Sequence, residues 1–330
     1  MAKIGITLDI RDGRVRDVSI RARDTGSATL AFTGMSATEL PARIGTVYSL
    51  CGRAQTIAAL GAIETALGFA ARPGIAAARD VLRRAETLSQ LAMRFALHWP
   101  RALGLPPDPA LPRACLAAEQ ALETALFFGS TWRTPGAGQP EADLAQAEQT
   151  LEQLEAAVKN FVTNNDLAAA VTDAGLDGFG ALPADVAPEG GTFSRRWEAP
   201  AVAEMRARHG PGLTARLTAG LTDLAGMVPE LRRALSQVVP AAPQQPACLS
   251  GHGIAVVETA RGPLTHRVEI ADGRITAYTI DAPTEKNFRP DGPVSAGLLG
   301  ARADGLDRAA ALHILAVDPC VEFELEVRHA

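Results

Sequence analysis

Two cysteines near opposite ends of the chain stand in settings that suit metal binding. Cys51 occurs in Leu50-Cys-Gly-Arg53, directly before a segment with helical periodicity, and Cys320 occurs in Asp318-Pro-Cys320. Thiolates are soft ligands for iron, nickel, zinc or copper(I), and the dipole at a helix N-terminus lowers the pKa of a cysteine placed there. We therefore expect Cys51 and Cys320 to form a metal site; the alternative is two inert buried thiols.

Further motifs lie between the two cysteines. Residues 258–266 read Glu-Thr-Ala-Arg-Gly-Pro-Leu-Thr-His, and residues 281–287 read Asp-Ala-Pro-Thr-Glu-Lys-Asn. Together with the cysteine motifs, and in the same order, these segments resemble the large subunit of nickel–iron hydrogenases, in which CGxCxxxH and DPCxxCxxH motifs hold the metal centre. The resemblance is weakest over residues 101–250, where helical patterns occur without a specific motif.

The resemblance implies roles for three more residues. Arg261 takes the place of the arginine beside the cyanide ligands of the iron, and Thr284 that of a hydroxyl residue that hydrogen-bonds a cyanide. Asp318 matches the aspartate of the second cysteine motif. A guanidinium and a hydroxyl group would stabilise a bound anion in a pocket of low dielectric constant. Each of these residues also has a purely structural interpretation. Arg261 would then be a strand-end arginine, Thr284 a turn-forming threonine, and Asp318 part of a helix-ending Asp-Pro pair.

The chain lacks several motif residues that hydrogen turnover requires in the large subunit. Ala54 and Phe323 replace the second cysteine of each motif, Ala58 and Glu326 replace the closing histidines, and Ala260 replaces the proline before the arginine. Two thiolates cannot build a four-thiolate nickel–iron centre, so we expect no enzyme activity and no complete centre. The pattern is similar to that of the large-subunit-like accessory proteins of hydrogenase maturation, the HupK and HoxV type.

That similarity implies a scaffold. In the finished hydrogenase site the iron carries two cysteine sulfurs and three diatomic ligands, so Cys51 and Cys320 would transiently hold an Fe(CN)2(CO) fragment before its transfer to the true large subunit. The implied partners are a HypC-type maturation chaperone and the hydrogenase large-subunit precursor. Two alternatives stay open: a metal-free, catalytically dead homologue that acts as a protein-binding module, and a degenerate enzyme with two thiolate ligands.

Composition argues against several other classes of protein. The 330 residues carry a net charge of −5, which gives no basic footprint for nucleic acid, and no apolar run is long enough to span a membrane. The N-terminal sequence alternates like a strand and lacks a signal peptide, so we expect a cytoplasmic location. Four scattered cysteines are too few for a disulfide framework, and we expect Cys115 and Cys248 to be non-catalytic.

The elements that must position these residues follow from periodicity and turn signals. Alternating residues predict strands at 3–10 and 14–22, around Asp12-Gly13, and at 253–258, 264–270 and 275–280. Helical periodicity predicts helices over 53–67, 76–97, 109–128, 141–162, 199–208, 212–236 and 306–317. The last of these helices delivers Asp318 and Cys320.

The low aromatic content of 5% and the abundance of alanine favour close-packed helices. We therefore expect an α+β fold of the hydrogenase large-subunit type: a central helical bundle, with strands from both termini in a shared sheet that brings Cys51 and Cys320 together. The expected organisation is a single domain, 1–330. Its parts are N-terminal strands (1–50), a helical region (51–239), a proline-rich linker (240–249), and a C-terminal part with strands, a short helix and the second cysteine motif (250–330).

Overall fold

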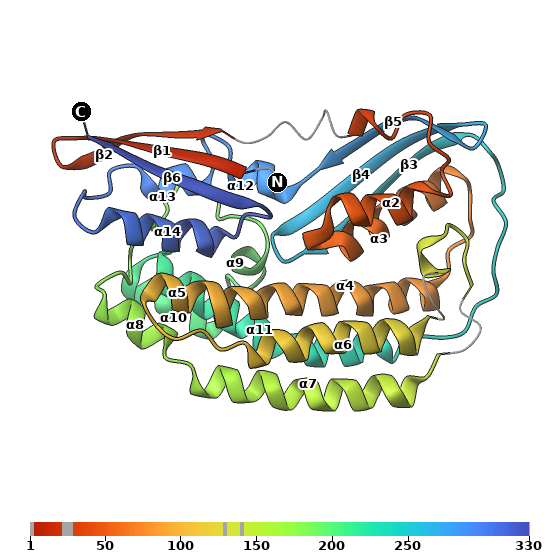
Figure 1. Cartoon of the computed structure of the whole chain (residues 1–330), viewed down its shortest axis with the longest axis horizontal. Helices are drawn as coiled ribbons and strands as arrows, with labels where there is room; N and C mark the ends of the chain where they lie inside the picture. Colours follow the sequence, from red (N-terminus) through yellow and green to blue (C-terminus); the bar gives the residue numbers. More distant parts are fainter. Residues whose placement is uncertain (1–2, 22–28, 128–130, 139–141, 330) are drawn as a thin grey trace.

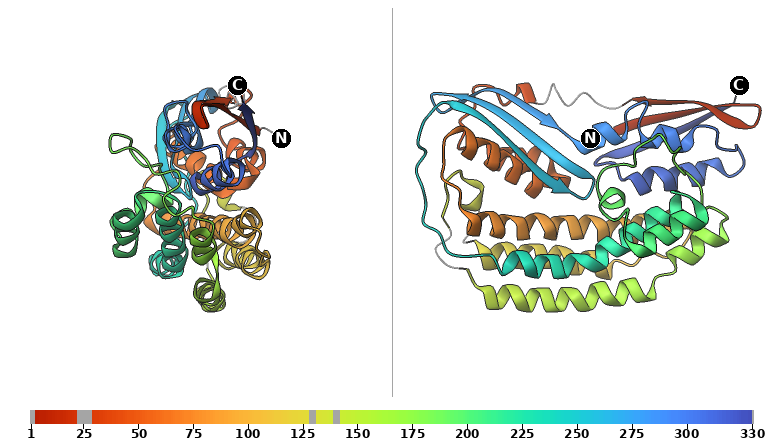
Figure 2. Two further views of the ribbon diagram at one scale, coloured as in Figure 1. Left: turned by 90° about the vertical axis from the view of Figure 1, so that its left-hand side faces the viewer. Right: turned by 180° about the vertical axis from the view of Figure 1, so that it is seen from behind.

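The computed structural model describes residues 3–21, 29–127, 131–138 and 142–329. Figure 1 shows an upper layer, in which two three-stranded sheets lie side by side, and a lower layer of long helices. Figure 2 shows the same two layers from the end and from behind. The sheets meet above the middle of the helical layer, and this junction is where the segments that carry the two cysteine motifs converge.

Four long helices form the lower layer. They are α4 (Pro73–Met93), α6 (Ala110–Leu126), α7 (Leu144–Asn164) and α11 (Leu213–Leu235). Each predicted helix of this region is present, although positions 128 and 141 of the predicted ranges lie outside the described residues. None of the described helices is both long enough and apolar enough to cross a membrane.

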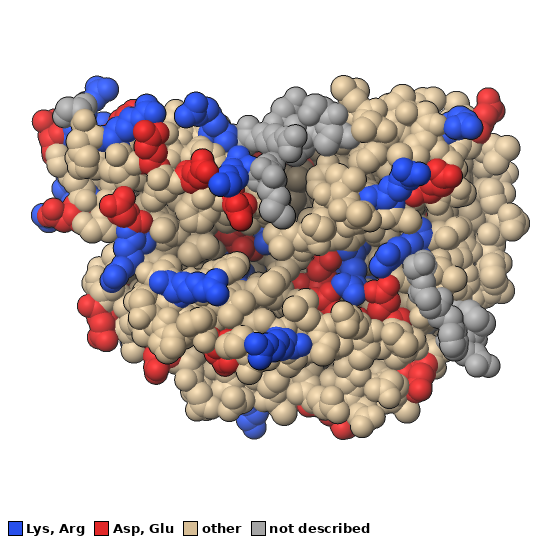
Figure 3. All heavy atoms as spheres, in the orientation of Figure 1, with Lys and Arg blue, Asp and Glu red and all other residues tan. Residues whose placement is uncertain are grey.

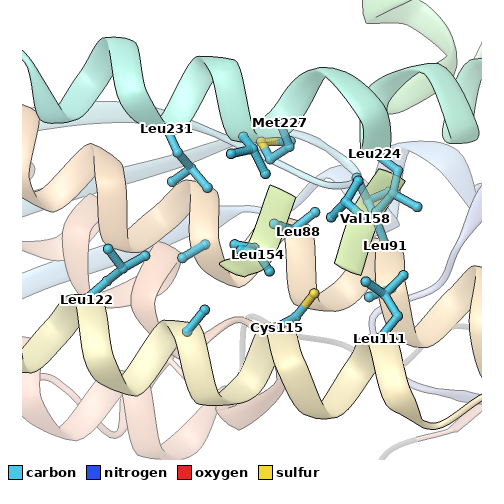
Figure 4. Close-up of a cluster of buried hydrophobic side chains, with 14 of the residues drawn as sticks. Leu88, Leu91, Leu111, Cys115, Leu122, Leu154, Val158, Leu224, Met227 and Leu231 are labelled. Atoms are coloured by element: carbon cyan, nitrogen blue, oxygen red, sulfur yellow. The ribbon is translucent and has the colours of Figure 1, made fainter. Parts of the chain in front are cut away.

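Apolar side chains at helical spacing fill the space between these helices. Leu88 of α4, Cys115 of α6, Leu154 of α7 and Leu224 of α11 belong to one buried cluster (Figure 4). Burial raises the pKa of the Cys115 thiol to about 12. Cys115 therefore packs as a small apolar residue of the helical core.

Shorter elements connect the long helices. The chain leaves α4 through a π-helical turn (Arg94–His98) into α5 (Trp99–Leu103), and a 3-10 turn (Thr131–Arg133) follows α6. Between α7 and α11 lie α8 (Leu167–Asp173), α9 (Thr192–Arg195) and α10 (Pro200–His209). Residues 240–249 contain no helix or strand and run along the side of the molecule (Figure 1).

The first sheet joins the two ends of the chain. β1 (Lys3–Arg11) pairs antiparallel with β2 (Arg14–Arg21) and parallel with β6 (Glu322–His329). Helices α13 (Pro293–Leu298) and α14 (Leu306–Val317) pack on its apolar face. The shared sheet expected from the sequence is confirmed, but the strand that joins β1 is β6. The hairpin is also confirmed, except that position 22 lies outside the described residues.

The second sheet contains the other predicted strands. β3 (Gly251–Thr259), β4 (Gly262–Ala271) and β5 (Arg274–Asp281) are antiparallel neighbours, and the short helix α12 (Pro283–Asn287) follows them. Helix α3 (Gly52–Ala66) packs on this sheet, preceded by α2 (Leu40–Val47) and a 3-10 turn (Ser49–Cys51). Because α3 begins directly after Cys51, the packing of α3 on the sheet sets the position of that cysteine.

Two glycines of β3 allow α3 to lie unusually close to the sheet. A Cβ at Gly253 would lie 1.9 Å from the Ala62 carbonyl oxygen, and one at Gly251 would lie 2.2 Å from that of Ala66. We expect Gly253→Ala to lower the free energy of unfolding by about 1–3 kcal/mol, because the helix must move away. Urea denaturation measures the change. Gly5→Ala is the matched control, since nothing lies within 4 Å of a Cβ there; equal stability of the two variants would contradict the prediction.

Candidate functional site

Cys51 is fixed by the crossing of α2 and α3. It ends the 3-10 turn and takes the N-cap position of α3, with a partly buried side chain. The next residue is Gly52, where a Cβ would lie 2.6 Å from the backbone oxygen of Gly45 in α2. Gln55, one turn into α3, donates from Nε2 to the Cys51 sulfur at 3.8 Å. The glycine of the first cysteine motif is therefore required by helix packing.

The lowered pKa that we expected for Cys51 is wrong. Burial raises the pKa of the thiol to about 12, and the neighbouring Glu86 carboxylate adds to this effect. Glu86 extends from α4 to the start of α3, where its oxygens accept the N–H groups of Arg53 at 2.8 Å and Ala54 at 3.0 Å. The helix dipole therefore stabilises the Glu86 carboxylate. Cys51 is a neutral thiol at pH 7 and must release a proton to bind a metal ion.

Arg261 lies in the tight turn between β3 and β4. Thr259 pairs with Gly262 across the turn, and its hydroxyl accepts the N–H of Arg261 at 3.2 Å. Gly262 has φ of 122°, which a residue with a side chain rarely adopts, and it lies against the backbone of Gly190. The Arg-Gly pair of the motif thus forms a turn that directs the buried Arg261 side chain into the junction of the two sheets.

Asp318 contacts Arg261 through its backbone and its side chain. Nε of Arg261 donates to the Asp318 carbonyl oxygen at 3.0 Å and lies 3.2 Å from Oδ2. Asp318 ends α14 in the left-handed conformation, with φ of 64° and ψ of 79°, which is uncommon for a residue other than glycine. This turn of the chain separates α14 from β6 and places Cys320, which is partly buried, at the junction.

The two cysteines and Arg261 lie within electrostatic reach of one another. A negative charge on Cys320 raises the pKa of Cys51, in addition to the larger effect of burial. Burial lowers the pKa of Arg261, but Asp318, Cys320 and Cys51 outweigh this effect and raise it above its ordinary value. The fold therefore brings together four of the five residues singled out from the sequence.

Thr284, the fifth, lies on a helix that packs beside this cluster. It is buried in the first turn of α12. Asn287 of the same helix donates from Nδ2 to the backbone oxygen of Arg261 at 3.3 Å. Glu285 interacts electrostatically with Tyr48, the residue before the turn that ends in Cys51. Helix α12 therefore borders the site on both the Arg261 and the Cys51 side.

Three polar residues belong to the site and were not identified from the sequence: Glu86 and Gln90 of α4, and Arg94 at the start of the π-helical turn that continues α4. Gln90 accepts a hydrogen bond from Nη1 of Arg261 at 2.6 Å and donates one to the Leu50 carbonyl oxygen at 2.8 Å. It thus links Arg261 to the segment that carries Cys51. The spacing of four residues was a signal, because it places all three side chains on one side of a helix.

Tyr48 is a further residue that the sequence did not reveal. Burial raises its pKa, and Cys51, Glu285 and Cys320 add to the shift, so the Tyr48 hydroxyl lies within electrostatic reach of both thiols. Its hydroxyl is buried and has no hydrogen-bond partner in the described part of the chain. An unpaired buried hydroxyl is costly, and this one is a hydrogen-bond donor available at the junction.

The protein supplies few metal ligands at this point. Among residues 3–21, 29–127, 131–138 and 142–329, no group of three or more His, Cys, Asp or Glu side chains is arranged to hold a metal ion. Figure 3 shows a hollow in the middle of one face, between the two halves of the upper layer, with charged side chains at its floor. The sulfur donors that the two cysteine motifs contribute at the junction are the thiols of Cys51 and Cys320.

Relatives and solved structures agree with the large-subunit resemblance. The chain is 31% identical over 384 residues to the hydrogenase expression/formation protein HupK of Rhizobium leguminosarum bv. viciae, covering 99% of this chain and 97% of the relative. It is 29% identical over 350 residues to HupV of Azotobacter chroococcum mcd 1, covering 99% of both chains. No family model matches the sequence.

The fold is similar to that of nickel–iron–selenium hydrogenases. The reduced, active enzyme of Desulfomicrobium baculatum superimposes with a TM-score of 0.74 at 15% identity and 95% coverage of both chains. The oxidised enzyme of D. vulgaris Hildenborough gives 0.73 at 16% identity and 94% coverage of both. These likenesses confirm the large-subunit-like fold that the sequence predicts.

Proposed function

The chain belongs to the HupK family of hydrogenase expression/formation proteins, and on this premise we propose that it is a scaffold in hydrogenase maturation. Cys51 and Cys320 hold an Fe(CN)2(CO) fragment until it passes to the true large subunit. The observation that carries the proposal is the meeting of the two thiols beside the buried guanidinium of Arg261, with no further cluster of donors in the described residues.

The ligand set of the fragment matches the groups that the site offers. Two soft sulfurs complete the coordination of an iron that already carries three diatomic ligands. The N–H groups of Arg261 that are not bonded to Asp318 or Gln90, and the unpaired hydroxyl of Tyr48, are donors for cyanide nitrogens. Thr284, on the adjacent helix, is the candidate for a further hydrogen bond. Asp318 holds Arg261 in place through its backbone carbonyl oxygen and its carboxylate.

A HypC-type chaperone that delivers the fragment and the hydrogenase precursor that receives it are the partners that this role requires. Delivery must also remove the proton of Cys51, because that thiol is neutral at pH 7. Affinity for the fragment is therefore expected to rise with pH. No bond in the fragment needs to break, so the role is one of holding and transfer.

Iron content tests the proposal. We expect protein co-produced anaerobically with the maturation machinery to contain close to one iron per chain, and Cys51→Ala and Cys320→Ala each to lose most of it. Cys248→Ala is the matched control. Cys248 donates to the Ala66 carbonyl oxygen at the far end of α3, which is about 22 Å from Cys51 for a helix of 15 residues.

The outcomes separate the alternatives. Iron in wild type and in Cys248→Ala but not in the other two variants supports the scaffold. Iron lost equally from all three variants would show non-specific thiol binding. Wild-type protein without iron under the same conditions would contradict the scaffold and favour the metal-free homologue that acts as a protein-binding module.

A further inference from the structure

Arg94 is a second buried guanidinium at the site, and it shares its counter-ion with Arg261. Nη1 of Arg94 lies 3.6 Å from Oδ2 of Asp318, the same oxygen that lies 3.2 Å from Nε of Arg261. Arg94 is 4% exposed and Arg261 is 5% exposed. A single carboxylate therefore faces two cations that water reaches poorly.

The hydrogen bonds of Arg94 are incomplete. Its Nη1 donates to the Ala316 carbonyl oxygen at 3.4 Å, whereas Nε and Nη2 are buried and have no partner among the described residues. Arg94 also borders a small cavity beside Ala316 and Val317, with room for about one water molecule. Buried N–H groups without partners are rare in folded proteins. The guanidinium carbon of Arg94 lies 4.8 Å from the centroid of the Phe95 ring, a cation–π contact that leaves these N–H groups unpaired.

The other carboxylates near Arg94 are already engaged. Asp223 lies 2.8 Å from guanidinium nitrogens of both Arg195 and Arg196. Glu86 is directed at the N-terminus of α3, where it accepts two backbone N–H groups. Glu189, which borders the same cavity as Arg94, pairs with Arg216 at 2.6 Å. Of the described carboxylates, Asp318 is then the one left to balance Arg94 and Arg261. The buried cluster around Asp318 thus carries one surplus positive charge, and through Arg261 this cluster lies within electrostatic reach of both cysteines.

From this surplus charge we infer that Arg94 makes the site selective for an anionic metal complex. The inference rests on the proposed function and names the residue that determines specificity. An Fe(II) held by two thiolates and two cyanides has a double negative charge, which the surplus cation stabilises. A bare divalent ion held by the same two thiolates is neutral overall and gains nothing from Arg94. The arginine thus favours the assembled fragment over free cobalt, nickel or zinc.

Arg94→Gln tests the inference with two probes. The first is the iron–cyanide group, loaded by co-production and followed by its infrared cyanide bands during dialysis; the second is Co²⁺ titrated into metal-free protein. We expect the cyanide bands of the variant to disappear at least about tenfold faster than those of wild type. The Co²⁺ affinity of the variant should stay within about twofold of the wild-type value. Arg94→Lys keeps the charge, so it should lose the cyanide bands at a rate within a few-fold of the wild-type rate.

Arg84→Gln is the matched control. It removes the same charge from α4, the helix that leads into the turn of Arg94, but Arg84 pairs with Asp80 at 2.6 Å and with Glu230 and has no contact with Asp318 among those of the described residues. Cyanide bands that persist equally in wild type and in Arg94→Gln would overturn the inference and leave the scaffold intact. An equal loss of Co²⁺ affinity would also overturn it, by showing a structural role. Wild-type protein that never carries the bands would overturn the scaffold and this inference together.

Discussion

Asp318→Ala is expected to lower the free energy of unfolding by about 3–5 kcal/mol, because it leaves two guanidinium groups buried without a carboxylate. Arg261 and Arg94 both depend on Asp318, at 3.2 Å and 3.6 Å. Neither arginine can turn to solvent, since both are almost fully buried. Urea denaturation followed by circular dichroism measures the change.

Part of that loss would come from backbone strain, and a control separates it. Alanine tolerates the left-handed conformation of residue 318 poorly. Asp272→Ala imposes the same strain in the exposed turn between β4 and β5, where φ is 48°, without touching a buried ion pair. We expect this control to cost about 1–2 kcal/mol. If the two variants are equally destabilised, the charge cluster at Asp318 does not stabilise the fold.

Glu86→Gln is expected to change how stability depends on pH. Burial raises the pKa of Glu86 to about 7 from 4.5, although the N–H groups of Arg53 and Ala54 oppose the shift. The native state thus holds this proton more tightly than the unfolded chain. The stabilisation of the native state that this tighter proton binding gives is fully present below pH 4.5 and is lost as the pH rises through 7. Relative to the variant, wild-type protein should lose about 2–3 kcal/mol between pH 5 and pH 8.

The comparison must be made as a difference between the two proteins. Burial lowers the pKa values of His266 and His313 to about 3, so they act in the opposite direction and reduce stability as the pH falls below 6.5. Both histidines are present in wild type and in Glu86→Gln, and their effect cancels in the difference. Denaturation at several pH values provides the data. A difference that does not vary with pH would show that Glu86 keeps an ordinary pKa.

Local sequence signals predicted most of the elements around the site. Asp12-Gly13 and Asp272-Gly273 mark the two hairpin turns, with positive φ at all four residues. Helical periodicity ending at Val317 predicted the helix that delivers Asp318. The strand β6 was missed as the partner of β1, because alternating glutamates at 322, 324 and 326 also fit a solvated tail.

The inner wall of the site could not be predicted in the same way. Glu86, Gln90 and Arg94 lie on the polar side of an amphipathic helix, and such a side normally faces water. Here the upper layer covers it, and all three residues are buried. The pKa of Cys51 was misjudged for the same reason, because Glu86 occupies the helix N-terminus and burial dominates. Both features depend on how the two layers pack, which periodicity within one segment does not reveal.

Infrared spectroscopy tests the central claim, that Cys51 and Cys320 jointly hold the iron fragment, most directly. Wild-type protein, Cys51→Ala and Cys320→Ala would be co-produced anaerobically with the maturation machinery and compared at equal concentration. The scaffold predicts cyanide and carbonyl stretches in wild type that are absent from both variants. Their absence from wild type, or their persistence in either variant, would contradict it.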